Sequence, residues 1–124
     1  MEVTSVAPDG RQIVQGYHPG GFVVAGKRLE GAILVLPDRT LPWPVVEPDL
    51  ISLEDFSPVT SADPPVELLI LGCGAKAVLV PQAVRHDLKS RGVALEAMAT
   101  PAACRTYNVL LAEDRRVAAA LIAV

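Results

Sequence analysis

The chain has 124 residues, of which 51% are apolar and 20% are charged. This length suits one domain, and so large an apolar fraction excludes a disordered segment. The 11 basic and 14 acidic residues give a net charge of −3, which argues against a general nucleic-acid-binding protein, because such proteins neutralise phosphates with a basic face. Two cysteines are too few for a disulfide framework and fall short of a structural zinc site, which needs four Cys or His ligands at fixed spacings, and the two histidines, His18 and His86, are far apart in sequence. We expect a single domain over residues 1–124 with no metal, no cofactor and no nucleic-acid partner.

The compartment is predicted from the first residues and from the apolar runs. Residues 1–5 carry neither a basic, apolar export signal nor an Arg-rich leader. The longest apolar runs, such as residues 117–124, are far shorter than the roughly 20 residues that cross a bilayer. The sequence therefore predicts a cytoplasmic protein of bacterial type without direct membrane insertion.

Prolines and glycines concentrate in the first two thirds of the chain, where short β-branched segments alternate with turns. Residues 40–43 contain one proline and precede another, which suits an edge strand at best. The pattern predicts an antiparallel β portion at the N-terminus, followed by one or two weak helical turns. The expected segments are strands at 13–17, 21–25, 27–29, 33–36 and 40–43, and helical turns within 50–56.

After Pro65, strand-like and helix-like segments alternate, which is typical of an α/β domain. Thr100 is expected to cap the second helix through its hydroxyl group. The charged turn at 113–116 is too short for a parallel crossover, so the last strand is expected to be antiparallel or to lie on another edge. The expected segments are strands at 66–71, 77–80, 93–98 and 117–124, with helices from Pro81 to Gly92 and from Thr100 to Glu113.

A glycine motif follows the clearest strand. Residues 72–77 read Gly-Cys-Gly-Ala-Lys-Ala, which matches the loose pattern of a dinucleotide-binding turn, with Glu96 about twenty residues further on. Such a site needs a helix that opens inside the pattern, and here β-prone residues and Pro81 follow instead. We therefore favour a tight strand-to-loop turn over a nucleotide site.

A second candidate site combines Glu96 with the helix after it. Glu96 interrupts an apolar strand, so it is expected to be buried and to need a partner. Arg105 lies near the positive end of its helix, where a cation is unfavourable, and Asn108 shares its face. Two interpretations stay open. Arg105 pairs with Glu96 in a purely structural role, or the residues line a small polar pocket at the C-terminal ends of the strands.

The two thiols allow a further alternative. Cys104 falls in the first turns of a helix, where the dipole lowers a thiol pKa, but neither histidine is adjacent in sequence. Cys73 and Cys104 could also approach each other at the same sheet edge as a redox pair. Buried, inert thiols explain both residues with fewer assumptions, and no catalytic residue is assigned.

Several motifs resemble one small single-domain family of unknown function. They are G-F-V-V-A-G at 21–26, Gly31, Trp43, E-L-L-I-L-G-C-G at 67–74, and the tail at 95–121, which begins L-E-A-M-A-T-P-A-A-C-R-T-Y-N. The family includes the adipogenesis-associated domain protein, the related mitochondrial respiratory complex I assembly factor, and many bacterial proteins. The resemblance covers nearly the whole chain, and this sequence resembles a bacterial member.

The resemblance implies an α/β fold of three layers around a central mixed β-sheet of about five strands, with the last strand antiparallel. It implies no established enzymatic activity, cofactor or catalytic residue. It favours a non-catalytic protein-interaction or assembly-factor-like protein with a protein partner, self-association remaining open. The alternative is binding of a small anionic metabolite or nucleotide at the C-terminal ends of the strands. The ligand-pocket candidates are Gly72, Cys73, Gly74, Glu96, Thr100, Cys104, Arg105 and Asn108.

Overall fold

The computed structural model describes residues 10–45 and 47–124, so the prediction about residues 1–5 lies outside the described part of the chain. Its first three strands form an antiparallel sheet in the order β1-β2-β3. The β2–β3 turn has two consecutive residues with positive φ, Ala25 at 49° and Gly26 at 81°, a conformation that suits a tight hairpin. The predicted N-terminal antiparallel portion is confirmed. Its strands are β1 Val14–His18, β2 Gly21–Val24 and β3 Lys27–Glu30.

A second, five-stranded mixed sheet has the order β5-β4-β8-β6-β7, which confirms the expected central sheet. The last strand, β8, is antiparallel to β4 as predicted, but it lies in the middle of the sheet and is also parallel to β6, so the expectation that no parallel crossover leads into it is wrong. The parallel pairing arises because helix α3 itself carries the chain back from β7 to β8, so the charged turn after α3 does not have to make the crossover. The strands are β4 Ile33–Val35, β5 Thr40–Pro42, β6 Leu68–Gly72, β7 Ala94–Met98 and β8 Val117–Leu121.

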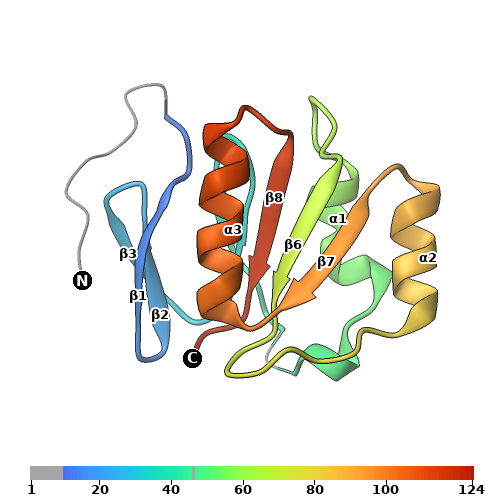
Figure 1. Cartoon of the computed structure of the whole chain (residues 1–124), viewed down its shortest axis with the longest axis horizontal. Helices are drawn as coiled ribbons and strands as arrows, with labels where there is room; N and C mark the ends of the chain where they lie inside the picture. Colours follow the sequence, from blue (N-terminus) through green and yellow to red (C-terminus); the bar gives the residue numbers. More distant parts are fainter. Residues whose placement is uncertain (1–9, 46) are drawn as a thin grey trace.

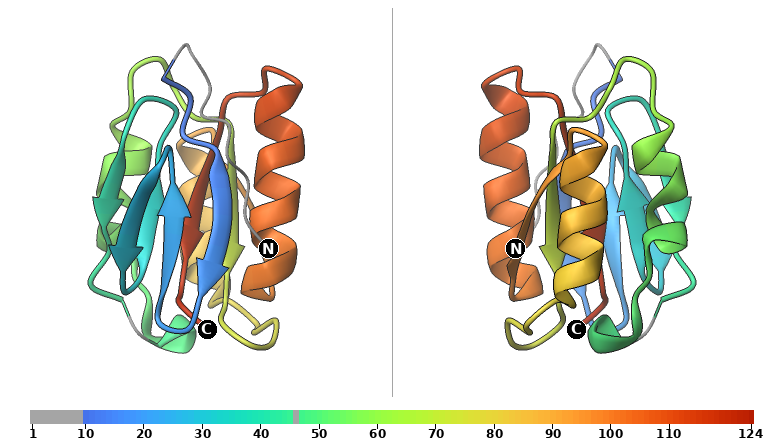
Figure 2. Two further views of the ribbon diagram at one scale, coloured as in Figure 1. Left: turned by 90° about the vertical axis from the view of Figure 1, so that its left-hand side faces the viewer. Right: turned by 90° about the vertical axis from the view of Figure 1, so that its right-hand side faces the viewer.

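Helices cover both faces of the five-stranded sheet and complete three layers (Figures 1 and 2). On one face lie α3 (Thr100–Ala112) and the three-stranded sheet. On the other face lie α2 (Gln82–Ser90), α1 (Ser57–Thr60) and two short 3-10 turns, η1 (Pro48–Leu50) and η2 (Leu53–Phe56). Within the described residues, none of the helices is long and apolar enough to span a bilayer.

The central strands divide two hydrophobic cores by simple alternation. In β6, Leu69 and Leu71 pack towards α2, whereas Ile70 packs towards α3, and all three are fully buried. Residues that alternate along a strand point to opposite faces, so a strand covered on both sides is apolar throughout. This confirms the interpretation of the apolar run at 66–71.

Two local predictions are wrong. Residues 77–80 form a loop instead of a strand: the positions beside β6 are taken by β7 and β8, and these four residues are not part of either sheet. The segment 93–98 was expected to be a buried strand, but β7 is an edge strand. Glu96 accordingly points to solvent and is exposed.

Candidate functional site

The three parallel strands of the central sheet end together at one end of the molecule (Figure 1). Gly72 ends β6, Thr100 is the second residue after β7, and Ile122 directly follows β8. This carboxyl end is where open α/β sheets form binding crevices. The fold therefore brings Gly72, Gly74 and Thr100, which the sequence marked separately, to one place.

The Thr100 side chain joins three segments here. Its hydroxyl group donates a hydrogen bond to the carbonyl oxygen of Ile122 at 2.6 Å and accepts one from the amide of Gly74 at 2.9 Å. The Thr100 amide donates to the Gly74 carbonyl at 2.9 Å. Thr100 is the first residue of α3 and Ala99 precedes it as the cap residue, so the prediction that the Thr100 hydroxyl caps the helix is wrong. The hydroxyl instead connects β6 to β8.

The glycines permit this close approach. A Cβ atom on Gly72 would lie 2.9 Å from the Thr100 hydroxyl oxygen and 3.0 Å from Leu121 Cδ2. Gly74 has a φ of +94°, which favours glycine. The chain then runs as a loop until α2 begins at Gln82, so no helix opens inside the glycine motif as a dinucleotide site requires. The structure agrees with a strand-to-loop turn.

Asn108 connects α3 to the first sheet. Its side-chain oxygen accepts a hydrogen bond from the amide of Val14 at 3.0 Å, and its side-chain nitrogen donates to the Val14 carbonyl at 2.7 Å. The Asn108 side chain therefore bonds both backbone groups of Val14, as a neighbouring β-strand would, and holds β1 against α3. The neighbouring Tyr107 hydroxyl adds a bond to the Gln12 carbonyl at 2.9 Å.

Glu96 and Arg105 do not join this arrangement. Both side chains are exposed, and across residues 10–45 and 47–124 neither makes a hydrogen bond or an ion pair. The predicted pairing of Arg105 with Glu96 is therefore wrong. Because β7 is an edge strand, Glu96 stays hydrated and needs no buried partner.

The two cysteines are buried as free thiols. Cys73 belongs to the core beneath α2 and Cys104 to the core beneath α3, on opposite faces of the sheet, which gives no support to a redox pair. Burial raises the pKa of the Cys104 thiol to about 11, and the nearby Arg105 cation offsets only part of this effect. At neutral pH Cys104 is therefore a protonated thiol and a poor nucleophile.

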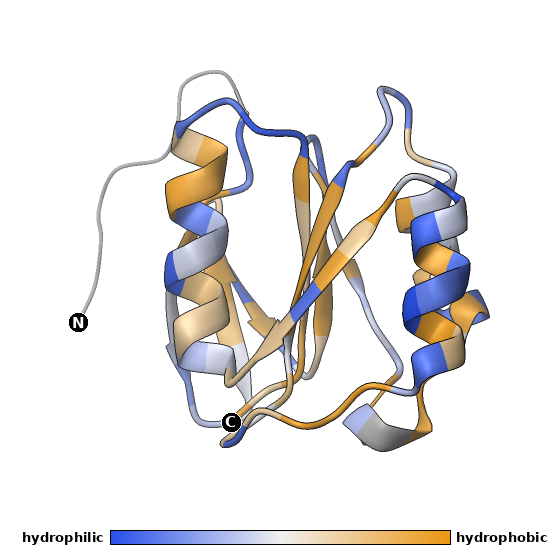
Figure 3. Cartoon of the chain, turned by 45° about the vertical axis from the view of Figure 1, so that its right-hand side comes forward, coloured by the Kyte–Doolittle hydropathy of each residue, from blue (hydrophilic) through white to orange (hydrophobic). Residues whose placement is uncertain are grey.

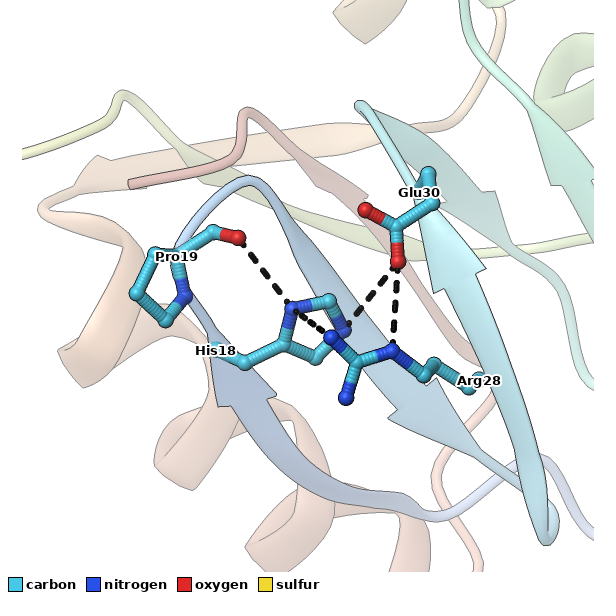
Figure 4. Close-up of polar contacts among 4 residues, drawn as sticks. All are labelled: His18, Pro19, Arg28 and Glu30. Carbon is cyan, nitrogen blue, oxygen red and sulfur yellow. Dashed lines mark hydrogen bonds and ion pairs between the residues drawn. The ribbon is translucent and has the colours of Figure 1, made fainter.

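A polar cluster that the sequence analysis missed lies at the β1–β2 turn (Figure 4). The Nδ1 atom of His18 is 3.2 Å from the Pro19 carbonyl oxygen and 3.3 Å from Arg28 Nη2. The His18 Nε2 atom is 3.7 Å from Glu30 Oε2, and Arg28 Nε is 3.3 Å from the same oxygen. Among the described residues, His18 Nε2 is buried without a hydrogen-bond partner.

The sequence signal that could have indicated this cluster is Gly21, which lies between His18 and Glu30 in the sheet. In the three-stranded sheet His18 pairs with Gly21, and Gly21 pairs with Glu30. A Cβ atom on Gly21 would lie 2.6 Å from His18 Cε1, so the missing side chain leaves room for the ring. The Gly20 amide also donates to the carbonyl of Val124 at 2.9 Å, which attaches the β1–β2 turn to the last residue of the chain.

Residues 14–122 match the family described as "Protein of unknown function (DUF498/DUF598)". The chain belongs to this family. It is 40% identical over 110 residues to NADH dehydrogenase [ubiquinone] 1 alpha subcomplex assembly factor 3 of Danio rerio. That match covers 89% of this chain and 63% of the zebrafish protein, so the chain spans less than two thirds of this relative. The predicted family resemblance is confirmed.

Bacterial proteins are similar over more of their own length. An uncharacterized protein of Rhodobacter capsulatus is 36% identical over 109 residues, which cover 88% of this chain and 82% of that protein. The solution structure of an Mth938-like domain from Bordetella pertussis has a TM-score of 0.81 at 28% identity, covering 98% of this chain and 92% of that one. These likenesses support the mixed α/β fold.

Proposed function

We propose that this family member is a non-catalytic, cytoplasmic protein-binding domain that helps to assemble a larger complex. The relatives named as respiratory-complex assembly factors support this proposal. The observation that carries it is an apolar loop at the carboxyl end of the sheet, residues 73–81, hereafter the Leu79 loop. Its Leu79 side chain is 89% exposed.

The Leu79 loop is anchored at both ends. The Cys73 amide donates to the Met98 carbonyl at 2.8 Å, and Val80, directly after Leu79, is buried in the core beneath α2. Figure 3 shows an apolar stretch of this loop running along the end of the molecule towards α2. Leu50 in η1 is a second exposed leucine, at 76%. A loop fixed at both ends loses less conformational entropy than a free one when a partner covers it.

The loop also defines the chemistry of the partner. Lys76 is its only charged residue and is exposed. Burial of a leucine side chain contributes about 1.5–3 kcal/mol, and a charged rim around an apolar contact adds specificity. We therefore expect a protein surface that offers an apolar pocket for Leu79 beside a carboxylate for Lys76.

The proposal is tested by photocrosslinking in cells that express the full chain. A photoreactive residue at position 79 should give one discrete adduct, whereas position 63, which is exposed in the segment before the amino end of β6, should give none. The adduct is identified by mass spectrometry, and the binary complex is rebuilt from purified proteins. An adduct of twice the chain mass would identify a second copy as the partner.

A matched pair of variants then tests the loop. Leu79→Asp should weaken the purified complex at least about tenfold, because it places a charge in an apolar contact. Val109→Asp introduces the same charge at a 57% exposed apolar position on α3 and should leave the affinity unchanged. Equal adducts at positions 79 and 63, or equal affinities for the two variants, would overturn the proposal.

The alternative, an anionic metabolite or nucleotide at the ends of the strands, has less support. The hydroxyl and the amide of Thr100, which an anion at the start of α3 would use, are already bonded to Ile122 and Gly74. Arg105 is the one cation among the predicted pocket residues, and it stands exposed. Titration with citrate or ATP, with Arg105→Ala as the control, tests this alternative.

A further inference from the structure

A cavity of about 320 Å³ lies between the two sheets, away from the Leu79 loop. It opens between the β2–β3 turn and the turn that leads into β5. Figure 2 shows the three-stranded sheet and the β4–β5 hairpin on the same side of the molecule. The volume corresponds to about ten water molecules at roughly 30 Å³ each, and it falls at the small end of ligand pockets.

The floor of this cavity is apolar and its polar wall is already satisfied. Val24 is buried and Leu29 is half-buried, and both contribute to the core beneath α3. The Thr40 hydroxyl donates to the Gln12 side-chain oxygen at 2.8 Å, and the Gln12 side-chain nitrogen donates to the Gly10 carbonyl at 2.9 Å. A ligand would therefore find apolar contacts inside and few unused hydrogen-bonding groups on the wall.

The rim, in contrast, carries unpaired charges. Lys27, Asp38 and Arg39 line the cavity and are exposed. Across the part of the chain that the structure describes, none of their side chains makes a hydrogen bond or an ion pair. Two cations and one carboxylate leave an excess of one positive charge at the mouth. One anionic group beside an apolar body would complement this arrangement.

Both rim segments are held in place without a ligand. Lys27 follows the two positive-φ residues of the β2–β3 turn, and the Gly26 amide donates to the side chain of Gln15. The Leu36 amide donates to the Arg39 carbonyl at 2.8 Å and closes the turn that carries Arg39. Such preorganisation lowers the entropy lost on binding.

We propose that this cavity binds a small amphipathic monocarboxylate. Its carboxylate lies between Lys27 and Arg39, and its alkyl part lies on Val24 and Leu29. The planar guanidinium of Arg39 suits a carboxylate geometrically, and Lys27 adds a point charge. This site is distinct from the Leu79 loop, so its failure would leave the proposed function untouched.

The test is an NMR titration of the full chain with octanoate, which has about ten non-hydrogen atoms. We expect saturable shifts of the amide resonances around Lys27, Leu29 and Thr40. Octanamide keeps the alkyl chain without the charge, and acetate keeps the charge without the chain. Each should bind at least about tenfold more weakly than octanoate, because each lacks one half of the contact.

Charge variants complete the test. Lys27→Met and Arg39→Met should each raise the octanoate Kd about tenfold or more, whereas Lys89→Met, at an exposed position on α2, should not change it. Circular dichroism checks that each variant is folded. If one of the two cation variants does not fold, the other still tests the proposal. Shifts outside the cavity, equal binding of octanoate and octanamide, or an unchanged Kd in both cation variants would overturn the proposal.

Discussion

The polar residues at and near the carboxyl end of the sheet form two groups that differ in burial and in bonding. Thr100 and Asn108 use their side chains to join segments far apart in the chain. Glu96 and Arg105 lie exposed and make no hydrogen bond or ion pair within residues 10–45 and 47–124. The comparison teaches that a polar residue in an apolar segment can be a structural connector, and that only its partners separate this role from ligand binding.

The largest effect is expected at the Thr100 connection. Thr100→Val keeps the shape of the side chain but removes the hydroxyl group, which leaves the Gly74 amide and the Ile122 carbonyl without their partner. Each buried, unsatisfied group costs about 1–3 kcal/mol, so unfolding in urea should show a loss of roughly 2–5 kcal/mol.

The matched control is Thr100→Ser, which retains the hydroxyl and loses one methyl group. Its free energy of unfolding should fall by about 1 kcal/mol, less than that of the valine variant. If valine were tolerated better than serine, the hydroxyl bridge would contribute nothing and the contrast between the two groups would disappear.

The second effect depends on pH. Burial raises the pKa of Cys104 to about 11 from 9.0, so the folded state resists deprotonation more than the unfolded chain does. The contribution of the Cys104 thiol to the free energy of unfolding is therefore fully present below about pH 9, and it is lost as the pH rises towards 11. Two pKa units correspond to roughly 2–3 kcal/mol. Burial also raises the pKa of Tyr107, which adds a loss in the same direction at higher pH.

Urea unfolding at pH 8 to pH 11 checks this, with Cys104→Ala as the comparison. The wild-type chain should lose stability more steeply than the alanine variant between pH 9 and pH 11, because the other titrating groups are common to both. Parallel curves would show that the Cys104 thiol titrates normally in the folded protein.

A third effect concerns Asn108. Asn108→Leu removes both bonds to Val14 and should lower the free energy of unfolding by about 1–3 kcal/mol. The Val14 amide loses its acceptor in this variant, so its hydrogen exchange should speed up relative to wild type. The exchange of the amides in β6 should change less. Asn108→Asp keeps that acceptor and should protect the Val14 amide better than leucine does. Equal exchange in the two variants would contradict the assigned role.

The strands and helices could mostly be predicted because alternation and turn residues are local signals. The apolar run of β6, the proline before α2 and the glycine after it mark these elements in the sequence. The direction of β8 was harder, since it depends on α3 acting as a crossover. The role of Thr100 depends on β6 and β8 being neighbours, and the exposure of Glu96 depends on β7 lying at the edge; strand order is not a local property.

The smallest effect is expected at Arg105. Arg105→Ala removes an exposed side chain with no bonded partner among the described residues, so the free energy of unfolding should stay within about 0.5 kcal/mol of wild type. The charge-preserving Arg105→Lys should behave in the same way. A loss of more than about 1 kcal/mol of unfolding free energy in the alanine variant alone would mean that Arg105 stabilises the fold, as Thr100 does. Unchanged stability combined with lost citrate binding would instead revive the anion site at the start of α3, since a ligand contact can be lost without a loss of folding energy.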